Sequence, residues 1–430
     1  MLIAGIGFIA LFALLFAGIP IAFGMVIVGT VGFAYLSGLP PALAMIGQVA
    51  FDTVLSYEFS VLPLFILMGN FVSRSRLSEE LYAASHACLG HRRGGLAMAT
   101  IVACAGFSAV CGSSLATAAT MSKVAMPSMR RYGYADSLAS GSIAAGGTLG
   151  ILIPPSVILV LYGIMTETEI GKLFAAGFLP GILGMALYML SANLVSRFNP
   201  DLGPAVARVD WSGRWAAMKG IWGILVLFGI VMGGIYFGVF SPTEAAGIGA
   251  SGAFLFALAR RTLNMRAIID VLIETGRTST MVFIVLIGAI MFSNFIDVTR
   301  APNNIQGFVE SLRIAPILVI LVILAIYIIL GCVLDSIAMM LLTVPIFYPL
   351  VAGLGYDLIW FGIIVVVVIE ISLITPPIGL NVYVLRATLP DVPLGTIFRG
   401  VTPFIFADVV RLALLVLLPG FVMLLPNLMD

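Results

Sequence analysis

Long apolar runs separated by short polar connections occupy nearly the whole 430-residue chain. A run of roughly twenty apolar residues is long enough to cross the hydrocarbon core of a bilayer as a helix. The pattern predicts about ten such spans, with boundaries uncertain by a few residues. The uninterrupted ones are expected near 2–18, 20–36, 57–73, 173–196, 220–240, 243–259, 279–298 and 402–426.

Four further apolar stretches contain residues that interrupt a helix. Stretch 95–129 is split at Gly112, and stretch 314–350 is split between Gly331 and Ser336. Stretches 138–165 and 358–388 each contain a Pro-Pro pair, which removes backbone donors and clashes with the preceding turn. The first two stretches are predicted to be re-entrant helical hairpins, although each is also long enough for two short full crossings.

The interruptions recur in the same order and at the same spacing in the two halves of the chain. Three pairs of matching landmarks lie 222 positions apart, namely Pro127 and Pro349, Gly133 and Gly355, and Pro154 and Pro376. Interrupted membrane segments at corresponding places in two halves indicate the binding site of a transporter. The predicted fold is therefore an all-α polytopic membrane protein with two repeats, each containing a hairpin and a broken helix.

Composition and charge agree with this class. Hydrophobic residues make up 61% and charged residues 10% of the chain, whereas a soluble domain has about 25% charged residues. The net charge of +1 gives no indication of a nucleic-acid partner, and no motif indicates an organic cofactor. If each split stretch enters and leaves on the same side of the membrane, all the basic clusters lie on one membrane face. The positive-inside rule then predicts that this face is cytoplasmic. These clusters lie at 74–76, 92–93, 130–131, 197–219, 260–266 and 399.

The same topology gives each half an odd number of spans, so that the second half is inverted relative to the first. Two full crossings per split stretch would leave this result unchanged. The expected first repeat is 1–197, with scaffold spans in 1–93, a hairpin and broken helix in 94–165 and a closing span in 172–197. A cytoplasmic linker follows at 198–219. The second repeat is 220–430, with the corresponding parts at 220–298, 314–389 and 400–427.

Each hairpin tip and its neighbouring Pro-Pro pair offer oxygen ligands. Prolines free the carbonyls of the preceding turn, and serine hydroxyls lie at the tip; such hard ligands suit Na⁺, or in principle another hard cation. The first predicted Na⁺ site comprises Gly112, Ser113, Ser114, Gly147, Gly150, Ile153 and Pro154. The second comprises Gly331, Asp335, Ser336, Ile374, Thr375 and Pro376. The alternative is that each Pro-Pro pair only bends a helix for packing.

The half-helices that begin after the Pro-Pro pairs direct their N-terminal amides inward, where they attract anions. A carboxylate substrate is therefore predicted between the two tips, with Ser156, Asn381 and Arg386 as candidate ligands. Arg386 could equally extend to the cytoplasmic face.

Three other charged positions have simpler interpretations. Asp408 and Arg411 lie three residues apart on one helix and are expected to pair. Glu370 is an intramembrane carboxylate that could support the ion site or carry a proton. Glu244 is expected in the first turn of a helix with a Ser or Thr cap.

These segments resemble the large membrane subunit, the DctM type, of tripartite ATP-independent periplasmic (TRAP) transporters. The resemblance covers essentially the whole chain and is specific at 107–117, 147–156, 241–246 and 375–381, with Cys111 as one departure. It implies import of carboxylate-bearing solutes such as C4-dicarboxylates or sialic acid, coupled to a Na⁺ gradient. It also implies an elevator motion, in which a mobile domain at roughly 94–165 and 314–389 slides against the remaining spans.

The resemblance further implies a location in the cytoplasmic (inner) membrane of a bacterium or archaeon, within the lipid bilayer. The implied partners are a small four-span membrane subunit, expected as a separate chain, and a periplasmic solute-binding protein. The alternative is a stand-alone Na⁺-coupled dicarboxylate symporter or antiporter of the same elevator class. An enzyme is disfavoured, because the sequence lacks Gly-x-Ser-x-Gly and His-Glu-x-x-His motifs and has no histidine at membrane depth. The identity of the carboxylate is not encoded in any motif.

Overall fold

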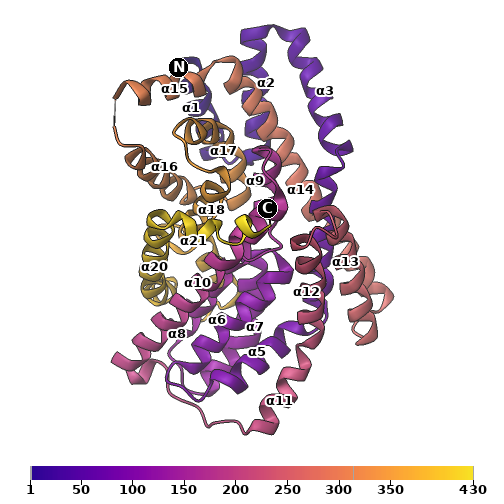
Figure 1. Ribbon diagram of the computed structural model, residues 1–430, viewed down its shortest axis with the longest axis vertical. Helices are drawn as coiled ribbons and strands as arrows, with labels where there is room; N and C mark the ends of the chain where they lie inside the picture. Colours follow the sequence, from indigo (N-terminus) through magenta and orange to yellow (C-terminus); the bar gives the residue numbers. More distant parts are fainter. Residues whose placement is uncertain (1, 313, 430) are drawn as a thin grey trace.

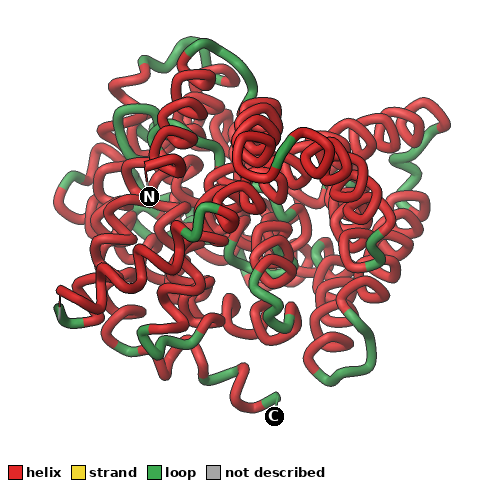
Figure 2. Tube along the Cα trace, turned by 90° about the horizontal axis from the view of Figure 1, so that it is seen from above, coloured by secondary structure: helices red, strands yellow, loops and turns green. Residues whose placement is uncertain are grey.

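The computed structural model describes residues 2–312 and 314–429, and within these ranges all regular structure is helical (Figures 1 and 2). The helices of the first half are α1 (Leu2–Phe16), α2 (Ile21–Ser37), α3 (Leu39–Leu55), α4 (Val61–Arg74), α5 (Leu77–Leu89), α6 (Gly95–Cys111), α7 (Ser114–Arg131), α8 (Asp136–Thr148), α9 (Val157–Met165) and α10 (Ile170–Phe198). Short 3₁₀ turns lie at Glu58–Ser60, Leu149–Ile151 and Pro200–Leu202.

The second half repeats this sequence of long and interrupted helices. Its helices are α11 (Trp211–Gly220), α12 (Trp222–Tyr236), α13 (Pro242–Ala259), α14 (Met265–Val298), α15 (Ala301–Leu312), α16 (Pro316–Gly331), α17 (Ser336–Gly353), α18 (Leu358–Ile374), α19 (Leu380–Thr388), α20 (Leu394–Leu417) and α21 (Pro419–Met423), and a 3₁₀ turn follows at Pro426–Leu428.

All four predicted interruptions end a helix. Chain reversals separate α6 from α7 and α16 from α17, and a Pro-Pro pair separates α8 from α9 and α18 from α19. Both Pro-Pro peptide bonds are cis. Hereafter the first tip is 112–114 and the second tip is 331–336, while the first break is 149–156 and the second break is 375–379.

Four helices lie outside the predicted spans, namely α3, α5, α11 and α15. Helix α3 lies between the predicted spans 20–36 and 57–73, and it meets the segment Glu58–Arg74 at a bend of 59°. Its first turn contains Pro40 and Pro41. Proline is compatible with the first turn of a helix, but two adjacent prolines also suggest a loop when only the sequence is considered. Helix α11 occupies the end of the predicted linker and meets α12 at a bend of 50°.

Among the described residues, four helices are long and apolar enough to cross a membrane, namely α10, α14, α17 and α20. The number becomes six if each bent pair is counted as one span, and five shorter apolar helices in the described ranges have 10–17 residues. The prediction of about ten spans counted stretches of apolar sequence. The structure divides several of those stretches into shorter helices, because the prolines, glycines and caps within them end the hydrogen-bonded turns.

The helices form two groups that lie side by side in Figure 1. In the first group, α2 packs along α14 and α4 packs along α13. The second group contains α6 to α10 and α16 to α20; within it, α20 packs along α8 and α10 packs against both α6 and α18. The two predicted closing spans, α10 and α20, are therefore packed against helices that flank the breaks.

Close backbone approach fixes the α8–α20 contact. A Cβ atom on Gly141 of α8 would lie 2.9 Å from the Cα atom of Gly400 on α20, a distance that real side chains do not tolerate. Small residues allow membrane helices to approach closely, because lipid provides no hydrophobic drive between them. This glycine pair thus joins the first and second halves of the chain in one packed unit.

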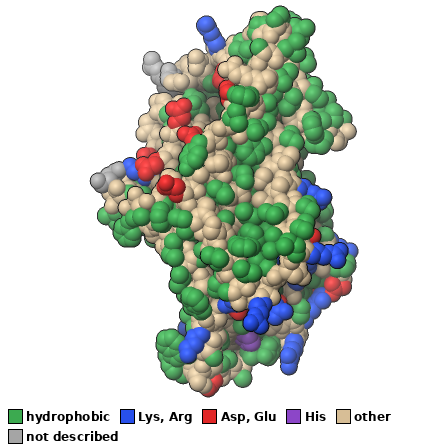
Figure 3. Space-filling model, turned by 90° about the vertical axis from the view of Figure 1, so that its right-hand side faces the viewer, with side chains coloured by type: hydrophobic (Ala, Val, Ile, Leu, Met, Phe, Trp, Pro, Cys, Tyr) green, Lys and Arg blue, Asp and Glu red, His purple; other side chains and the backbone are tan. Residues whose placement is uncertain are grey.

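One end of the molecule is strongly basic. In the view of Figure 3, lysine and arginine side chains gather over the lower part of the surface, with hydrophobic side chains above them. Helices α5 and α11 lie at this end in Figure 1. The same end is expected to face the cytoplasm if the positive-inside rule applies.

Candidate ion-binding and transport site

The first tip lies directly against the first break. Gly112 has a left-handed φ of +64°, and a Cβ atom there would lie 3.3 Å from the carbonyl oxygen of Pro155. Ser113 caps α7, because its Oγ accepts a hydrogen bond from the Ala116 amide at 3.4 Å. Ser114 begins the helix and is only 3% exposed. In the structure, the serine oxygens of the first tip therefore lie beside the carbonyl groups of the first break.

Glycines in and beside the first break make this contact possible. A Cβ atom on Gly150 would lie 3.0 Å from Ser108 Oγ and 3.3 Å from the carbonyl carbon of Ser113. A Cβ atom on Gly147 would lie 3.3 Å from the Ser114 carbonyl oxygen. Ile153 and Pro154 are buried in the same break. All seven residues of the first predicted ion site are thus in or next to the contact between tip and break.

The second tip and the second break are also joined. Cys332 Sγ donates to the Pro376 carbonyl oxygen at 3.9 Å, and Gly331 packs against Ser372 in the last turn of α18. Thr375 Oγ1 donates to the Ile371 carbonyl oxygen at 2.6 Å, within the turn that ends α18 at the buried Ile374. The structure brings together the two parts of the second predicted ion site as well.

Asp335 has a structural role that is visible in the structure. Its Oδ1 atom accepts hydrogen bonds from the amides of Ile337 and Ala338, both at 3.0 Å, and so caps α17, which begins at Ser336. The Asp335 side chain is exposed, whereas Ser113, which caps α7 at the corresponding place in the first half, is half-buried. The two tips therefore differ in charge and in exposure, although their helices are interrupted in the same way.

Two candidate substrate ligands are buried beside the breaks. Ser156 caps α9: its Oγ donates to the Ile151 carbonyl oxygen at 2.5 Å and accepts from the Leu159 amide at 3.3 Å. Asn381 donates from Nδ2 to the Ala144 carbonyl oxygen at 3.1 Å, which joins α19 to α8. Its Oδ1 atom is buried and has no hydrogen-bond partner in the described part of the chain. An unsatisfied buried oxygen of this kind is available to a ligand.

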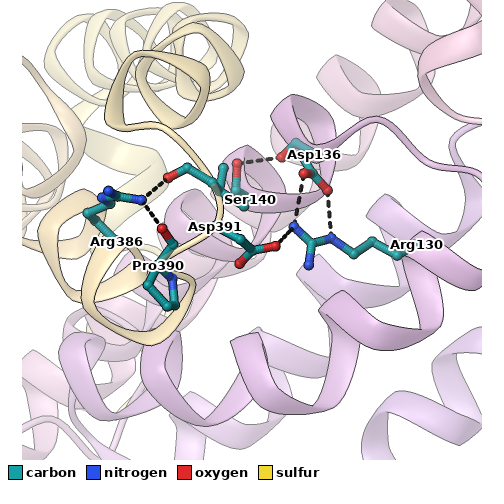
Figure 4. A network of polar contacts seen from close by, with 7 residues as sticks. Arg130, Asp136, Ser140, Arg386, Pro390 and Asp391 are labelled. Atoms are coloured by element: carbon teal, nitrogen blue, oxygen red, sulfur yellow. Dashed lines mark hydrogen bonds and ion pairs between the residues drawn. The ribbon is translucent and has the colours of Figure 1, made fainter.

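Arg386 lies in the last turn of α19, next to the connection between α19 and α20 (Figure 4). Its Nη1 atom donates to the carbonyl oxygens of Pro390 at 2.5 Å and Val392 at 2.8 Å. This arrangement matches the alternative in which the side chain extends to the surface of the molecule. A substrate contact for Arg386 stays a prediction. The two hydrogen bonds give the side chain a structural role, because they hold the segment between α19 and α20 against the end of α19.

A salt bridge next to Arg386 joins the two halves of the chain. Arg130 at the end of α7 contacts Asp136 at 2.8 Å and Asp391 at 2.5 Å (Figure 4). Asp391 follows α19, so this guanidinium connects the first hairpin to the second broken helix. The Arg130 hydrogen bond holds the pKa of Asp391 below its ordinary value.

This pKa shift predicts how acid affects the folded protein. A lowered pKa in the folded state means that Asp391 contributes stability at neutral pH, and this contribution is lost as pH falls through the folded pKa. We expect Asp391→Asn to lower the melting temperature slightly at pH 7 and to leave it unchanged at a pH where Asp391 is protonated. Thermal unfolding in detergent at a series of pH values measures this difference. An equal loss at every pH would show that the ion pair is not its cause.

The paired charges of α20 are confirmed, and a third partner was not foreseen. Arg411 Nη2 lies 2.8 Å from Asp408 Oδ1, as the three-residue spacing predicted. The same guanidinium also contacts Glu370 of α18, which is 41 positions away in sequence. Glu244 behaves as expected, because it forms a capping box with Ser241 at the start of α13.

Comparisons with known proteins place the chain among membrane transporters. A family model described as tripartite ATP-independent periplasmic transporter, DctM component, matches residues 8–421. The chain belongs to this family and is a multi-pass membrane protein. It is 36% identical over 392 residues to the C4-dicarboxylate TRAP transporter large permease protein DctM of Pseudomonas aeruginosa, covering 90% of each chain.

Two further relatives have different substrates in their names. The chain is 31% identical to the sialic acid TRAP transporter large permease protein SiaM of Vibrio cholerae, covering 96% of each chain. It is 32% identical to the ectoine/5-hydroxyectoine TRAP transporter large permease protein UehC of Ruegeria pomeroyi, covering 93% of this chain and 92% of the relative.

Solved structures share the overall fold at low sequence identity. The YdaH transporter of Alcanivorax borkumensis matches with a TM-score of 0.60 and 15% identity, over 89% of each chain. The MtrF protein of Neisseria gonorrhoeae matches with a TM-score of 0.59 and 13% identity, over 90% of this chain and 85% of that one. At this level of identity the likeness concerns the fold alone.

Proposed function

We propose that the protein is the large membrane subunit of a secondary transporter that imports a carboxylate-bearing solute, driven by a Na⁺ gradient. The observation that carries the proposal is the contact between tip and break in each half of a chain that belongs to a transporter family. Two of the relatives are named for C4-dicarboxylate and sialic acid transport. Neither solute is assigned to this chain, because much of the selection is expected to lie in a binding protein.

The proposed ion sites are supported by their ligand chemistry. Each break ends a helix at its C-terminus, where carbonyl oxygens lack amide donors and carry partial negative charge. The first tip adds serine oxygens and the second adds an exposed carboxylate. Carbonyl, hydroxyl and carboxylate oxygens are hard ligands that suit Na⁺. The half-helices α9 and α19 begin on the far side of the breaks, and their amides would attract the substrate carboxylate.

We propose that the two halves of the chain are inverted repeats and that the protein works by an elevator mechanism. In this mechanism the second helix group moves relative to the first. The second group would carry the tips and breaks across the membrane, and the first group would remain fixed. The mobile part then includes α10 and α20 in addition to 94–165 and 314–389, because these helices pack along α8, α6 and α18. The glycine contact between α8 and α20 and the Arg130 salt bridges would hold this unit together during the movement.

The proposed partners are a small four-span membrane subunit and a periplasmic solute-binding protein. The first helix group offers an apolar surface for the former, including exposed Phe23, Ile27, Leu43 and Phe51 on α2 and α3. The proposed location is the inner membrane, with the basic end of the molecule in the cytoplasm.

Uptake in proteoliposomes tests this function. The chain and its small-subunit partner would be reconstituted with a Na⁺ gradient and a labelled C4-dicarboxylate or sialic acid, with and without the binding protein from the same operon. We expect uptake only when both the gradient and the binding protein are present. Gradient-driven uptake without the binding protein would instead identify a stand-alone symporter, and uptake that ignores the gradient would refute Na⁺ coupling.

Two substitutions test the tips separately. Ser114→Ala removes a hydroxyl from the first tip, and Asp335→Asn removes the charge at the second tip while retaining an equivalent helix cap. Because loss of even an indirect metal contact costs about 10–100-fold in affinity, we expect each variant to raise the half-saturating Na⁺ concentration by roughly tenfold or more. Rates of Na⁺-driven uptake over a range of Na⁺ concentrations give this value.

The matched controls are Ser311→Ala on α15 and Asp52→Asn on α3, which are exposed and lie outside both tips and breaks. Both controls should keep the wild-type Na⁺ dependence. If Ser114→Ala and Asp335→Asn also keep it while folding normally, the tips do not hold the coupling ions.

A further inference from the structure

A cluster of charged side chains is enclosed within the second helix group. Glu370 of α18 and Asp408 and Arg411 of α20 are each 0% exposed. Arg411 Nη2 contacts Glu370 and lies 2.8 Å from Asp408 Oδ1. Tyr188 of α10 donates from its hydroxyl to Asp408 Oδ2 at 2.5 Å, and the hydroxyl of Thr148 at the end of α8 lies 3.2 Å from the Tyr188 hydroxyl.

The charges in this cluster do not balance if both acids are ionised. Two carboxylates face one guanidinium, and α8 and α10 contribute only the neutral hydroxyls of Thr148 and Tyr188. An uncompensated negative charge would then be sealed in the protein interior. Such a charge costs several kcal/mol even after the surroundings relax, and a buried carboxyl group usually binds a proton instead.

The contacts show which acid is better suited to be neutral. Asp408 accepts a hydrogen bond from Tyr188 on Oδ2, and its Oδ1 forms no hydrogen bond but lies 2.8 Å from Arg411 Nη2. Each oxygen of Asp408 thus faces a donor or a cation, as in an ionised carboxylate. Glu370 receives Arg411 on Oε2 alone, and its buried Oε1 has no hydrogen-bond partner among the described residues. An unpartnered hydroxyl in this position costs far less than an unpartnered charged oxygen.

A metal ion is a poorer solution to the same imbalance. A hard cation requires about six oxygen ligands, and only two carboxylate oxygens of the cluster, Glu370 Oε1 and Asp408 Oδ1, form no hydrogen bond among the described residues. No group of three or more metal-binding side chains occurs in the part of the chain that the structure describes. A proton needs only the single oxygen that is present.

We propose that Glu370 is a buried proton-binding site, with the proton on Oε1 and an ionised Asp408–Arg411 pair beside it. The cluster as a whole is then neutral. It lies between the two breaks: Thr148 ends α8 at the first break, and Glu370 is in the last turns of α18 before the second. If the proposed elevator motion is correct, neutrality allows this core to move within the membrane without carrying an unpaired charge. The proton site itself does not depend on that motion.

Infrared spectroscopy of the purified chain with its small subunit at pH 7 tests the proposal. A protonated carboxyl group has a C=O stretching band that carboxylates lack and that shifts in D₂O. We expect this band in the wild-type protein and its loss in Glu370→Gln, which replaces a neutral acid by a neutral amide of the same shape. Asp408→Asn should also remove the band, because Glu370 would then release its proton and become the only anion facing Arg411.

The controls concern folding and specificity. Glu370→Gln should keep the elution profile and melting temperature of the wild type, and Glu79→Gln, at an exposed position on α5, should keep the band. If Glu370→Gln fails to fold, Asp408→Asn still tests whether the cluster holds a proton. Absence of the band in the wild type, or a band that survives either substitution in folded protein, would overturn the proposal. None of these readouts requires transport activity.

Discussion

Replacing Arg411 with methionine is expected to lower the free energy of unfolding by about 3–5 kcal/mol, because the buried carboxylate of Asp408 loses its cation. Methionine retains much of the volume of the side chain, so that the effect reports charge more than packing. Gly184 of α10 lies against the guanidinium, which is fully buried. Denaturant titration in mixed detergent micelles, followed by tryptophan fluorescence, measures the change.

Arg399→Met is the matched control, because Arg399 lies on the same helix but is exposed. Its effect should stay within about 0.5 kcal/mol. A similar small effect for Arg411→Met would mean that Asp408 takes up a proton at little cost and that the ion pair contributes little to stability. Combining Arg411→Met with Asp408→Asn should recover part of the loss, since no ionised group then remains in the cluster.

Replacing Gly150 with valine is expected to reduce the apparent Na⁺ affinity by roughly 5–150-fold. The added side chain would overlap Ser108 and push against Ser113, which separates the first tip from the first break. Overpacking a close contact costs about 1–3 kcal/mol, and a loss of that size in ligand binding corresponds to the expected change. Na⁺-driven uptake at a series of Na⁺ concentrations, compared with Gly150→Ala as an intermediate step, measures it.

Gly276→Val on α14 provides the matched control, since an added Cβ atom there meets nothing within 4 Å. This variant should transport with wild-type Na⁺ dependence. An unchanged half-saturating Na⁺ concentration in folded Gly150→Val would exclude the contact between tip and break from the ion site, while leaving the assignment to the transporter family intact.

The candidate ion sites were accessible from the sequence because their cause is local. A proline lacks an amide and a glycine lacks a Cβ atom, so the positions where helices end depend on the residues at those positions. The helix caps formed by Ser113 and Asp335 are also local, because each side chain accepts hydrogen bonds from amides two or three residues later. That each tip touches its own break was a hypothesis based on the repeat, and the structure supplies the contacts at Gly112, Gly150 and Cys332.

Other features could not be inferred from local patterns. The short-range pair between Asp408 and Arg411 was predicted, but the contact between Arg411 and Glu370 required α18 and α20 to be neighbours. Arg386 was equally compatible with a substrate site and with the surface, and its contacts with Pro390 and Val392 lie in a connecting segment. Helix α3 was missed because its opening prolines resemble a loop.

The sequence by itself determined the class of protein, the interrupted helices and their repetition in the two halves. The reason is that apolar runs, prolines and glycines affect the backbone conformation at their own positions. Only the tertiary structure decided which helices pack together, including the inclusion of α10 and α20 in the group with the tips and breaks. It also decided that Asn381 bonds to Ala144 and that three charged groups share one enclosed space. Burial and charge balance depend on residues brought together from distant parts of the chain, and no local pattern records them.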